Sequence, residues 1–448
     1  MSQTFSIMKN HYSSRGPLAH DPADLLRSYL LMLQTGTFSI TDWVDNMRRV
    51  PLYAILSGFT PGKTPGIGTF YDFFKRLWLT KLPNFTPKKK RKRKKPKKDK
   101  KKGEKAPTTT TSKVAKLVAC IERSQSRKRL LPFDQIHTLF KQLFVRPSAQ
   151  KGLLGDTQNL CLAGDGTPLR TSVYPRSKRT CNCRENGIYD CDCLRIYSQP
   201  DCDTGWDSYR ECFFNGYHLY MFTTSSSKYD LPVYPHLHKA SRHDSVSLLL
   251  TFEELQQRHP DWNVSRVLLD AAHDAMPIYH YFNKHKIVPL IDLNKRNAGN
   301  TKYKDDFSIS PAGIPICKKG LEMKNNGYDH TRGRRKYRCP LVKKGVVTCD
   351  SPCSESPYGR CVYTYTQDNL RLFPTIARDS NEWKNTYKRR TTVERSNKRE
   401  KVNYMLEAGR HRSTKMWTIR LYGIIICQHM DAWFKESNLE LQSTLLTA

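Results

Sequence analysis

Asp165, Asp270 and Glu394 are the residues of this sequence best suited to metal-assisted chemistry on a phosphate. Asp165 lies in "AGDGT" and Asp270 in "VLLDAAHD", each after an apolar run that predicts a strand, and Glu394 lies on a predicted helix. Carboxylates that converge at one sheet edge can hold two Mg²⁺ or Mn²⁺ ions, which activate water or a 3′-hydroxyl in phosphoryl transfer. We therefore predict that these three residues are catalytic and hold the metal.

Each of these acids also has a structural alternative. Asp165 could form a turn with the glycine that follows it, Asp270 could cap the next helix, and Glu394 could pair with the lysine one helical turn later. His243 and Asp244, in "ASRHDS", could lie near the catalytic edge as well. An isolated His-Asp pair is, however, more often a structural hydrogen bond.

The segment "YKRRTTVERSNKREK", residues 387–401, places Glu394 among many cations. Four of its residues are offset by 0, 3, 7 and 14 positions: Tyr387, Arg390, Glu394 and Lys401. A regular α-helix, at about 100° per residue, brings such offsets onto one narrow face. A carboxylate beside a phenol, a guanidinium and an ammonium suits work on a polyanion, because the acid can hold a cation while its neighbours bind phosphates. The alternative is a solvated basic helix face.

The charge of the chain favours a nucleic-acid partner. The 448 residues include 76 Lys and Arg against 41 Asp and Glu, a formal charge of +35. Residues 88–105, "KKKRKRKKPKKDKKKGEK", predict a disordered linker, for which contact with DNA is a simpler interpretation than a nuclear address. The N-terminus has no apolar signal core and no apolar run is long enough to span a bilayer, so we expect a cytoplasmic protein without a membrane role.

The elements that must position these residues indicate an α/β protein. Residues 22–80 predict a helical module, and from about residue 150 short apolar runs alternate with helical patterns, which predicts an α/β sheet. Two of the predicted strands end near Asp165 and Asp270. The composition suggests five segments: a helical DNA-binding domain (1–86), a basic linker (87–112), the first part of the core (113–296), a cysteine-rich insertion (297–375) and a C-terminal helical region that contains Glu394 (376–448).

Eight cysteines fall into two groups that could each close a tetrahedral zinc site. The first group is Cys181, Cys183, Cys191 and Cys193; the second is Cys339, Cys349, Cys353 and Cys361, with Cys317 upstream. In a reducing cytosol such clusters indicate metal binding before disulfides. Neither group has the common Cys-x2-Cys pairing, so reduced surface thiols or redox-labile pairs are the alternative to zinc.

The motifs together resemble a known family. The spacing of Tyr387, Arg390, Glu394 and Lys401 is similar to the Tyr-Arg-Glu-Lys signature of bacterial insertion-sequence transposases of the DDE superfamily, in the group often numbered four. In this resemblance "AGDGT" is the first acidic motif and "VLLDAAHDA" the second, and the likeness extends loosely over residues 20–85 and 150–435.

The resemblance implies a ribonuclease-H-like catalytic core with an inserted, largely β domain. It also implies that Arg390 and Lys401 hold DNA phosphates near the cut and that Tyr387 packs or hydrogen-bonds beside the terminal nucleotides. Where relatives often carry Gly-Tyr-Asp shortly after the second acid, this chain has "AHD" at 272–274. The second catalytic acid could therefore be Asp270 or Asp274, of which Asp270 is better placed at a strand end.

We accordingly expect a DNA transposase that hydrolyses element ends with Mg²⁺ and then joins the 3′-hydroxyl to target DNA. Its partners would be terminal inverted repeats and target DNA, in the bacterial cytoplasm near the nucleoid. Pairing of two DNA ends favours a homodimer in the synaptic complex. The alternatives are a related DDE nuclease without joining activity and an inactive, zinc-stabilised DNA-binding protein.

Overall fold

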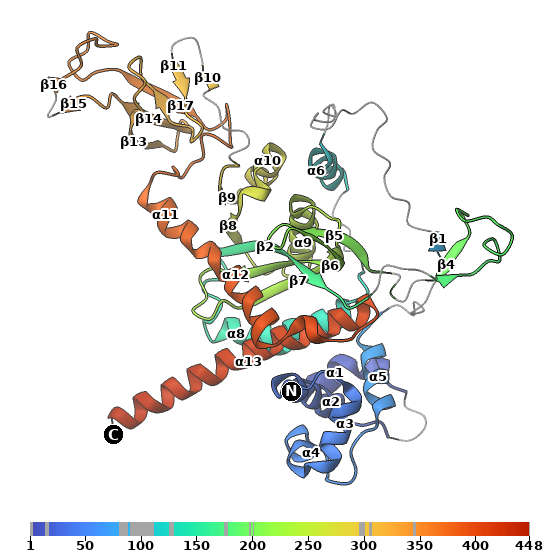
Figure 1. Ribbon diagram of the computed structural model, residues 1–448. Helices are drawn as coiled ribbons and strands as arrows, with labels where there is room; N and C mark the ends of the chain where they lie inside the picture. Colours follow the sequence, from blue (N-terminus) through green and yellow to red (C-terminus); the bar gives the residue numbers. More distant parts are fainter. Residues whose placement is uncertain are drawn as a thin grey trace.

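A computed structural model (Figure 1) describes most of the chain. The described residues are 3–13, 18–79, 88–89, 112–124, 130–173, 178–196, 199, 201–294, 301–303, 307–343 and 346–447. The predicted basic linker, 87–112, lies outside these ranges except for Lys88, Lys89 and Ser112.

A mixed sheet of six strands forms the centre of the molecule. Its strands are β2 (Leu160–Arg170), β5 (Asp203–Asp207), β6 (Cys212–Thr224), β7 (Pro232–Lys239), β8 (Val264–Leu269) and β9 (Val288–Ile291). The order is β5-β6-β2-β8-β9, with β7 also paired to β6. β2 is antiparallel to β6 and parallel to β8, and β8 is parallel to β9. The predicted α/β class is confirmed as a mixed α/β fold.

The strand that carries Asp165 is longer than its sequence predicts. β2 continues to Arg170, so Asp165 lies inside the strand, and the prediction of a strand end or a turn at this position is wrong. The reason is the partner strand, because β6 pairs with β2 as far as Arg170 opposite Gly216. On the other side, β8 pairs with β2 only up to Ala163 opposite Leu268. Asp165 therefore lies at the level where β8 ends, beside Asp270.

Helices cover both faces of this sheet. α9 (Asp244–Arg258) contacts β2, β6 and β7, whereas α12 (Thr391–Lys398) contacts β2 and β6. Phe222 packs against Phe252 of α9, and the next residue, Thr223, lies 3.2 Å from the hydroxyl of Thr392 on α12. Successive side chains of a strand point to opposite faces, so α9 and α12 lie on opposite sides of the sheet. α10 (Met276–Lys284) connects β8 to β9.

The predicted N-terminal helical module is helical, and it shares a core with the end of the chain. Its helices are α1 (Gln3–Met8), α2 (Pro22–Gln34), α3 (Ile40–Arg49), α4 (Pro51–Ser57) and α5 (Ile67–Arg76). α2 packs on the long helix α13 (Thr414–Thr447), where a Cβ added to Gly423 would overlap Tyr29 and Leu33. Figure 1 shows α13 between the sheet and these helices. Three further helices precede the sheet: α6 (Lys113–Arg123), α7 (Asp134–Phe140) and α8 (Arg146–Gln150).

Two groups of short strands project from the central sheet. The described part of the cysteine-rich insertion consists of β10 (Thr301–Tyr303), β11 (Phe307–Ile309), β12 (Pro315–Ile316), β13 (Lys324–Asp329), β14 (Arg334–Arg338), β15 (Val342–Lys343), β16 (Val346–Val347) and β17 (Cys361–Tyr365). Figure 1 shows these strands at the upper left, beyond α11 (Asn381–Tyr387). The second group is a small sheet of β1 (Lys88–Lys89), β4 (Leu194–Ile196) and β3 (Lys178–Arg179).

None of the helices in the described parts of the chain combines the length and the apolar character needed to cross a membrane.

Candidate active site and metal-binding residues

Asp165 is a partly buried acid with other acids nearby. Burial and, after it, the charges of Asp270 and Asp244 raise the pKa of Asp165 to about 7. Within the part of the chain that the structure describes, the Asp165 carboxylate makes no hydrogen bond or ion pair. Close carboxylates repel one another, so the position of Asp165 favours either a proton or a bound cation.

Asp270 directly follows β8 and is held by its own local turn. Its Oδ1 accepts hydrogen bonds from the backbone N–H of Ala272 at 3.1 Å and from Nδ1 of His273 at 2.6 Å. Burial alone would raise the pKa of Asp270, but the hydrogen bond and charge of His273 lower it. The predicted capping role is therefore confirmed, although the cap is on a 3₁₀ turn, Ala271–His273. Both recorded bonds go to Oδ1, which leaves Oδ2 for another ligand.

His273 and Asp274 are structural residues of the same loop. His273 is fully buried, and its Nε2 lies 3.0 Å from the Tyr220 hydroxyl. The Asp274 side chain is also inaccessible, and the Arg371 guanidinium binds both of its oxygens at 2.7 and 2.6 Å. This ion pair ties the loop to the chain that returns from the insertion, so the Asp274 carboxylate has no oxygen facing an open site.

The segment that carries Glu394 is helical but irregular. α11 is followed by a 3₁₀ turn, Lys388–Arg390, then by α12 and a π-helical stretch, Arg399–Asn403. The prediction of one regular α-helix is therefore wrong, because tighter and wider turns flank α12. The irregular turns nonetheless direct side chains from both ends of the segment to the sheet.

Two residues of the predicted tetrad contact the two strands that carry the aspartates. The Tyr387 hydroxyl donates a hydrogen bond of 3.0 Å to the carbonyl of Leu269, the residue before Asp270. The Lys401 ammonium donates one of 2.7 Å to Oγ1 of Thr167, two residues after Asp165. These contacts place the helical segment across β2 and the end of β8.

Arg390 and Glu394 lie between these two anchors. Arg390 Nη2 and Glu394 Oε1 are 2.6 Å apart, so the i,i+4 partner of Glu394 is Arg390 and not the predicted lysine, Lys398. The Glu394 side chain is 47% exposed and that of Arg390 only 19%. The positive charge of Arg390 also acts on Asp165, whose pKa it lowers slightly against burial and the other acids. Arg390 thus lies within electrostatic reach of both Asp165 and Glu394.

The three predicted catalytic acids do not form a single tight cluster. Among the described residues, their oxygen atoms do not form a set within 4.8 Å of one another. Glu394 is directed to Arg390, whereas Asp165 and Asp270 are close enough to affect each other's charge state. Mutual repulsion and the Arg390 pair are sufficient physical reasons for this separation.

Asp244 is a fourth acid near this site. It begins α9, and its Oδ1 lies 2.8 Å from Nε2 of His218. Burial would raise the pKa of Asp244, but the hydrogen bond from His218 lowers it. Gly166 permits this approach, because a Cβ there would overlap both side chains. The sequence suggests a place for Asp244 near the catalytic edge, but only as an alternative. No sequence pattern predicts that His218 lies beside Asp244, because this contact depends on how β6 pairs with β2.

A sequence profile described as "Transposase DDE domain" matches residues 162–429, which is more than half of the chain. The chain belongs to this family. The matched region of the transposase begins just before Asp165 and extends past Lys401, so it contains all three predicted acids and the whole tetrad. No curated protein matches the chain.

The first cysteine group of the transposase forms a cluster. The sulfur atoms of Cys181, Cys183, Cys191 and Cys193 all lie within 4.8 Å of one another, and no other group of three or more potential ligands is so gathered among the described residues. A hydrogen bond from the backbone of Cys183 lowers the pKa of the Cys181 thiol to about 7. Four thiols in this arrangement could hold a metal ion.

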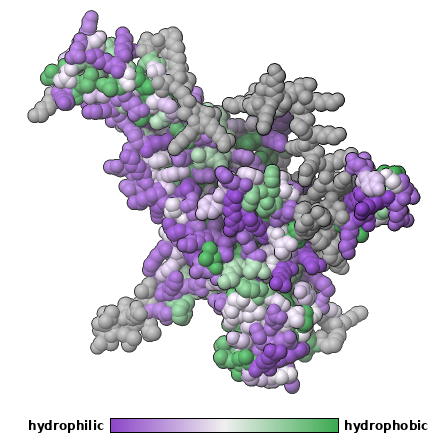
Figure 2. Space-filling model, in the orientation of Figure 1, coloured by the Kyte–Doolittle hydropathy of each residue, from purple (hydrophilic) through white to green (hydrophobic). Residues whose placement is uncertain are grey.

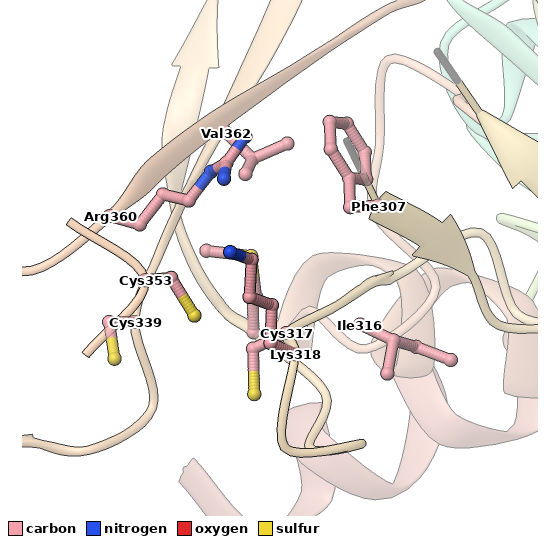
Figure 3. Close-up of a pocket in the computed structure, with 9 residues that line it drawn as sticks. Phe307, Ile316, Cys317, Lys318, Cys339, Cys353, Arg360 and Val362 are labelled. Atoms are coloured by element: carbon pink, nitrogen blue, oxygen red, sulfur yellow. The ribbon is translucent and has the colours of Figure 1, made fainter. Parts of the chain in front are cut away.

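The second cysteine group is arranged differently from its prediction. Cys339 and Cys353 line a small cavity of the transposase together with Cys317, as Figure 3 shows. Cys361 is exposed on β17 and does not line this cavity. Cys349 does not line the cavity either, so the cavity joins only two of the four predicted cysteines, and a zinc site in this group stays a prediction.

Proposed function

We propose that this transposase cuts DNA at the ends of a mobile element and joins the resulting 3′-hydroxyl to target DNA, with Asp165, Asp270 and Glu394 as the catalytic acids. The observation that carries the proposal is the placement of Tyr387 and Lys401, which hold one helical segment against both aspartate strands. A helix whose basic face is only solvated would not need these two contacts with the sheet. Membership of the DDE transposase family supports the same assignment.

The strand order supports a ribonuclease-H-like core. β7, β6 and β2 form an antiparallel unit, and β8 and β9 add to it in parallel through α9 and α10. The first acid then lies on β2 and the second directly after the adjacent strand β8, and the third comes from a helix on one face. The strand-rich segment between β9 and α11 fits the inserted domain of the group that the tetrad resembles.

The acids fit a divalent cation. Asp165 has no hydrogen-bond partner among the described residues, and Oδ2 of Asp270 is equally free of recorded bonds. Oxygen ligands of this kind are preferred by Mg²⁺ and Mn²⁺. When bound, the metal would activate water or a 3′-hydroxyl and stabilise the leaving oxygen. Glu394 would complete the site by turning away from Arg390, which becomes free to bind phosphate.

The basic residues of the tetrad orient the DNA. Arg390 can bind a phosphate through two N–H groups once Glu394 has turned to the metal. Lys401 has three N–H donors, of which two bind Thr167 and Pro168. The Glu407 carboxylate lies 3.9 Å from the same ammonium, so a phosphate would compete with Glu407 for the third donor. Tyr387 fixes the segment on the Leu269 carbonyl and presents its ring beside Arg390 to the terminal nucleotides.

Single-turnover cleavage of a duplex that carries the sequences flanking the coding region tests the proposal. Asp165→Asn, Asp270→Asn and Glu394→Gln should each abolish cleavage in Mg²⁺ while DNA affinity stays within a few-fold. Asp230→Asn is the matched control, because it removes one carboxylate charge that pairs with Arg395 on the same helix. Cleavage by Glu394→Gln at the wild-type rate would refute the assignment.

A strand-transfer assay separates transposase from nuclease. Wild-type protein, supplied with ends already cut to expose the 3′-hydroxyl, should join them to a target plasmid. Cutting without joining would identify a related nuclease, and DNA binding without either activity would identify an inactive descendant. Two ends must be held together for this reaction, so we expect a homodimer when DNA is bound.

A further inference from the structure

The hairpin of β3 and β4 projects from the central sheet without a core of its own. Figure 2 shows it at the right as a small, mostly hydrophilic projection. Its larger apolar side chains are exposed, among them Ile188, Tyr189 and Leu194. None of residues 178–196 belongs to either hydrophobic cluster of the described chain. A hairpin with strands of two and three residues is too small to be stable without an added constraint.

The cysteines of this hairpin supply the geometry of such a constraint. Cys181 and Cys191 Sγ atoms are 3.6 Å apart, as are those of Cys183 and Cys193. A tetrahedral zinc with Zn–S bonds of about 2.3 Å requires sulfur atoms about 3.8 Å apart. The turn between the two Cys-x-Cys pairs brings both pairs to one point, so all four sulfur atoms can bind a single ion.

A buried arginine gives a second, independent indication of negative charge. The Arg195 side chain on β4 is almost completely buried, and Nη2 donates a hydrogen bond of 3.2 Å to Cys191 Sγ. A buried guanidinium is expensive unless an anion lies beside it, and a neutral thiol is a weak acceptor. A zinc ion with four thiolates carries two net negative charges, which Arg195 would partly neutralise.

We propose that Cys181, Cys183, Cys191 and Cys193 bind one structural Zn²⁺ ion that holds the hairpin together and thereby fixes the start of the lysine-rich segment to the catalytic domain. β4 is the middle strand of the small sheet and pairs with both β3 and β1. β1 is Lys88–Lys89, the first two residues of the basic run 88–105. Figure 1 shows β1 beside β4, at the opposite side of the view from the insertion.

The site would be structural and not catalytic. Four protein ligands close the coordination of zinc and leave no position for water or substrate. Each thiol gives its proton to solvent on binding, so affinity falls at low pH. The effect on DNA would be indirect, because the ion orders the strand to which the basic run is attached.

Zinc content measured by mass spectrometry tests the site without using DNA. Protein purified without chelators should lose one zinc per chain in the Cys183→Ser/Cys193→Ser double variant compared with wild type. Cys120→Ser is the matched control, because Cys120 is exposed on α6 outside both groups. In the native wild-type chain, removal of zinc with a chelator should make about four more thiols reactive. Unchanged zinc content in the double variant, or two disulfides in freshly purified protein, would overturn the proposal.

Limited trypsin digestion tests the link to β1. Cleavage after Lys88 and Lys89 should be slow in the zinc-loaded protein and at least several-fold faster after chelation or in the double variant, since a paired strand resists proteases. Cleavage elsewhere in the core should keep its rate. Equal trypsin cleavage at these lysines with and without zinc would refute the link. If any of these samples fails to cut DNA, that result bears only on the proposed transposase reaction.

Discussion

Lys401 and Thr167 join the helical segment to the strand that carries Asp165. The Nζ to Oγ1 distance is 2.7 Å, and the same ammonium donates to the carbonyl of Pro168. Burial lowers the pKa of Lys401, although Glu407 and Glu400 oppose this effect. The side chain is still 23% exposed, so one cation both anchors β2 and faces the solvent from which DNA would approach.

Lys401→Ala should lower single-turnover cleavage at least tenfold, because loss of a phosphate contact and of the anchor displaces the reacting groups. The variant should change the slope of log K for DNA binding against log salt concentration by at most about one unit. Thr167→Val removes one of the two hydrogen-bond acceptors of Lys401 and should stay within about threefold of wild type. Equal losses in the two variants would show that Lys401 positions β2 and does not bind phosphate.

Asp274→Ala should destabilise the fold by about 3–5 kcal/mol, because it leaves the Arg371 guanidinium without its buried partner. The measurement is denaturant unfolding. Asp329→Ala, which removes a more exposed carboxylate beside Arg334, is the control and should cost less than about 1 kcal/mol. A folded Asp274→Ala protein of normal stability that fails to cleave would instead make Asp274 the second catalytic acid.

Asp244→Asn and Asp270→Asn should differ in cleavage. Asp244 is occupied by His218, so its amide variant should keep cleavage within about tenfold of wild type, whereas Asp270→Asn should leave none. Both variants should bind DNA, since each removes a negative charge. If Asp244→Asn also loses all cleavage at unchanged stability, Asp244 is a metal ligand of this site.

Glu400 gives the stability of the protein a defined pH dependence. Burial raises the pKa of Glu400 to about 7, against hydrogen bonds from Gln428 and Ser396 that lower it. The folded chain therefore keeps a proton that the unfolded chain loses near pH 4.5, and the resulting stability is lost as the pH rises from there through 7. The full loss is about 3 kcal/mol for one group.

Glu400→Gln mimics the protonated side chain and should not lose stability as the pH rises. Comparison of its free energy of unfolding with that of wild type therefore measures the loss in wild type. Its free energy of unfolding relative to wild type should be larger at pH 8 than at pH 5, by about 2–3 kcal/mol. Glu382→Gln, at an exposed carboxylate, should show the same difference at both pH values. A constant difference for Glu400→Gln would mean that Glu400 is ionised in the fold.

The parts of the site that depend on local sequence could be predicted, and those that depend on strand pairing could not. Asp270 follows an apolar run whose length matches β8, so its position after the strand was accessible from the sequence. The sequence predicts a strand end near Asp165, with a turn formed by the glycine that follows as the alternative. Gly166 instead continues β2, since β6 is long enough to pair with the whole strand.

Side-chain partners were similarly hard to foresee when they come from distant segments. The helical spacing places Arg390 and Lys398 equally near Glu394, and only the burial of Arg390 beside Asp165 decides between them. The cavity that joins Cys317 to Cys339 and Cys353 depends on how the insertion folds, which the spacing of the cysteines does not show. The first cysteine group is within one hairpin, and there the sequence was sufficient.

The packing of α2 on Gly423 and Cys427 makes the order of synthesis important. The Cys427 thiol lies against the Leu30 carbonyl, a contact between residues 397 positions apart. During translation, Tyr29 and Leu33 leave the ribosome long before the part of α13 that covers them is made. Their apolar side chains therefore stay uncovered while the catalytic strands are synthesised. Contacts of such long range fold slowly and expose nascent chains to aggregation. Translation that stops before residue 423 should therefore yield a chain that needs a chaperone or is degraded, and the cell would hold few partial copies able to compete for DNA.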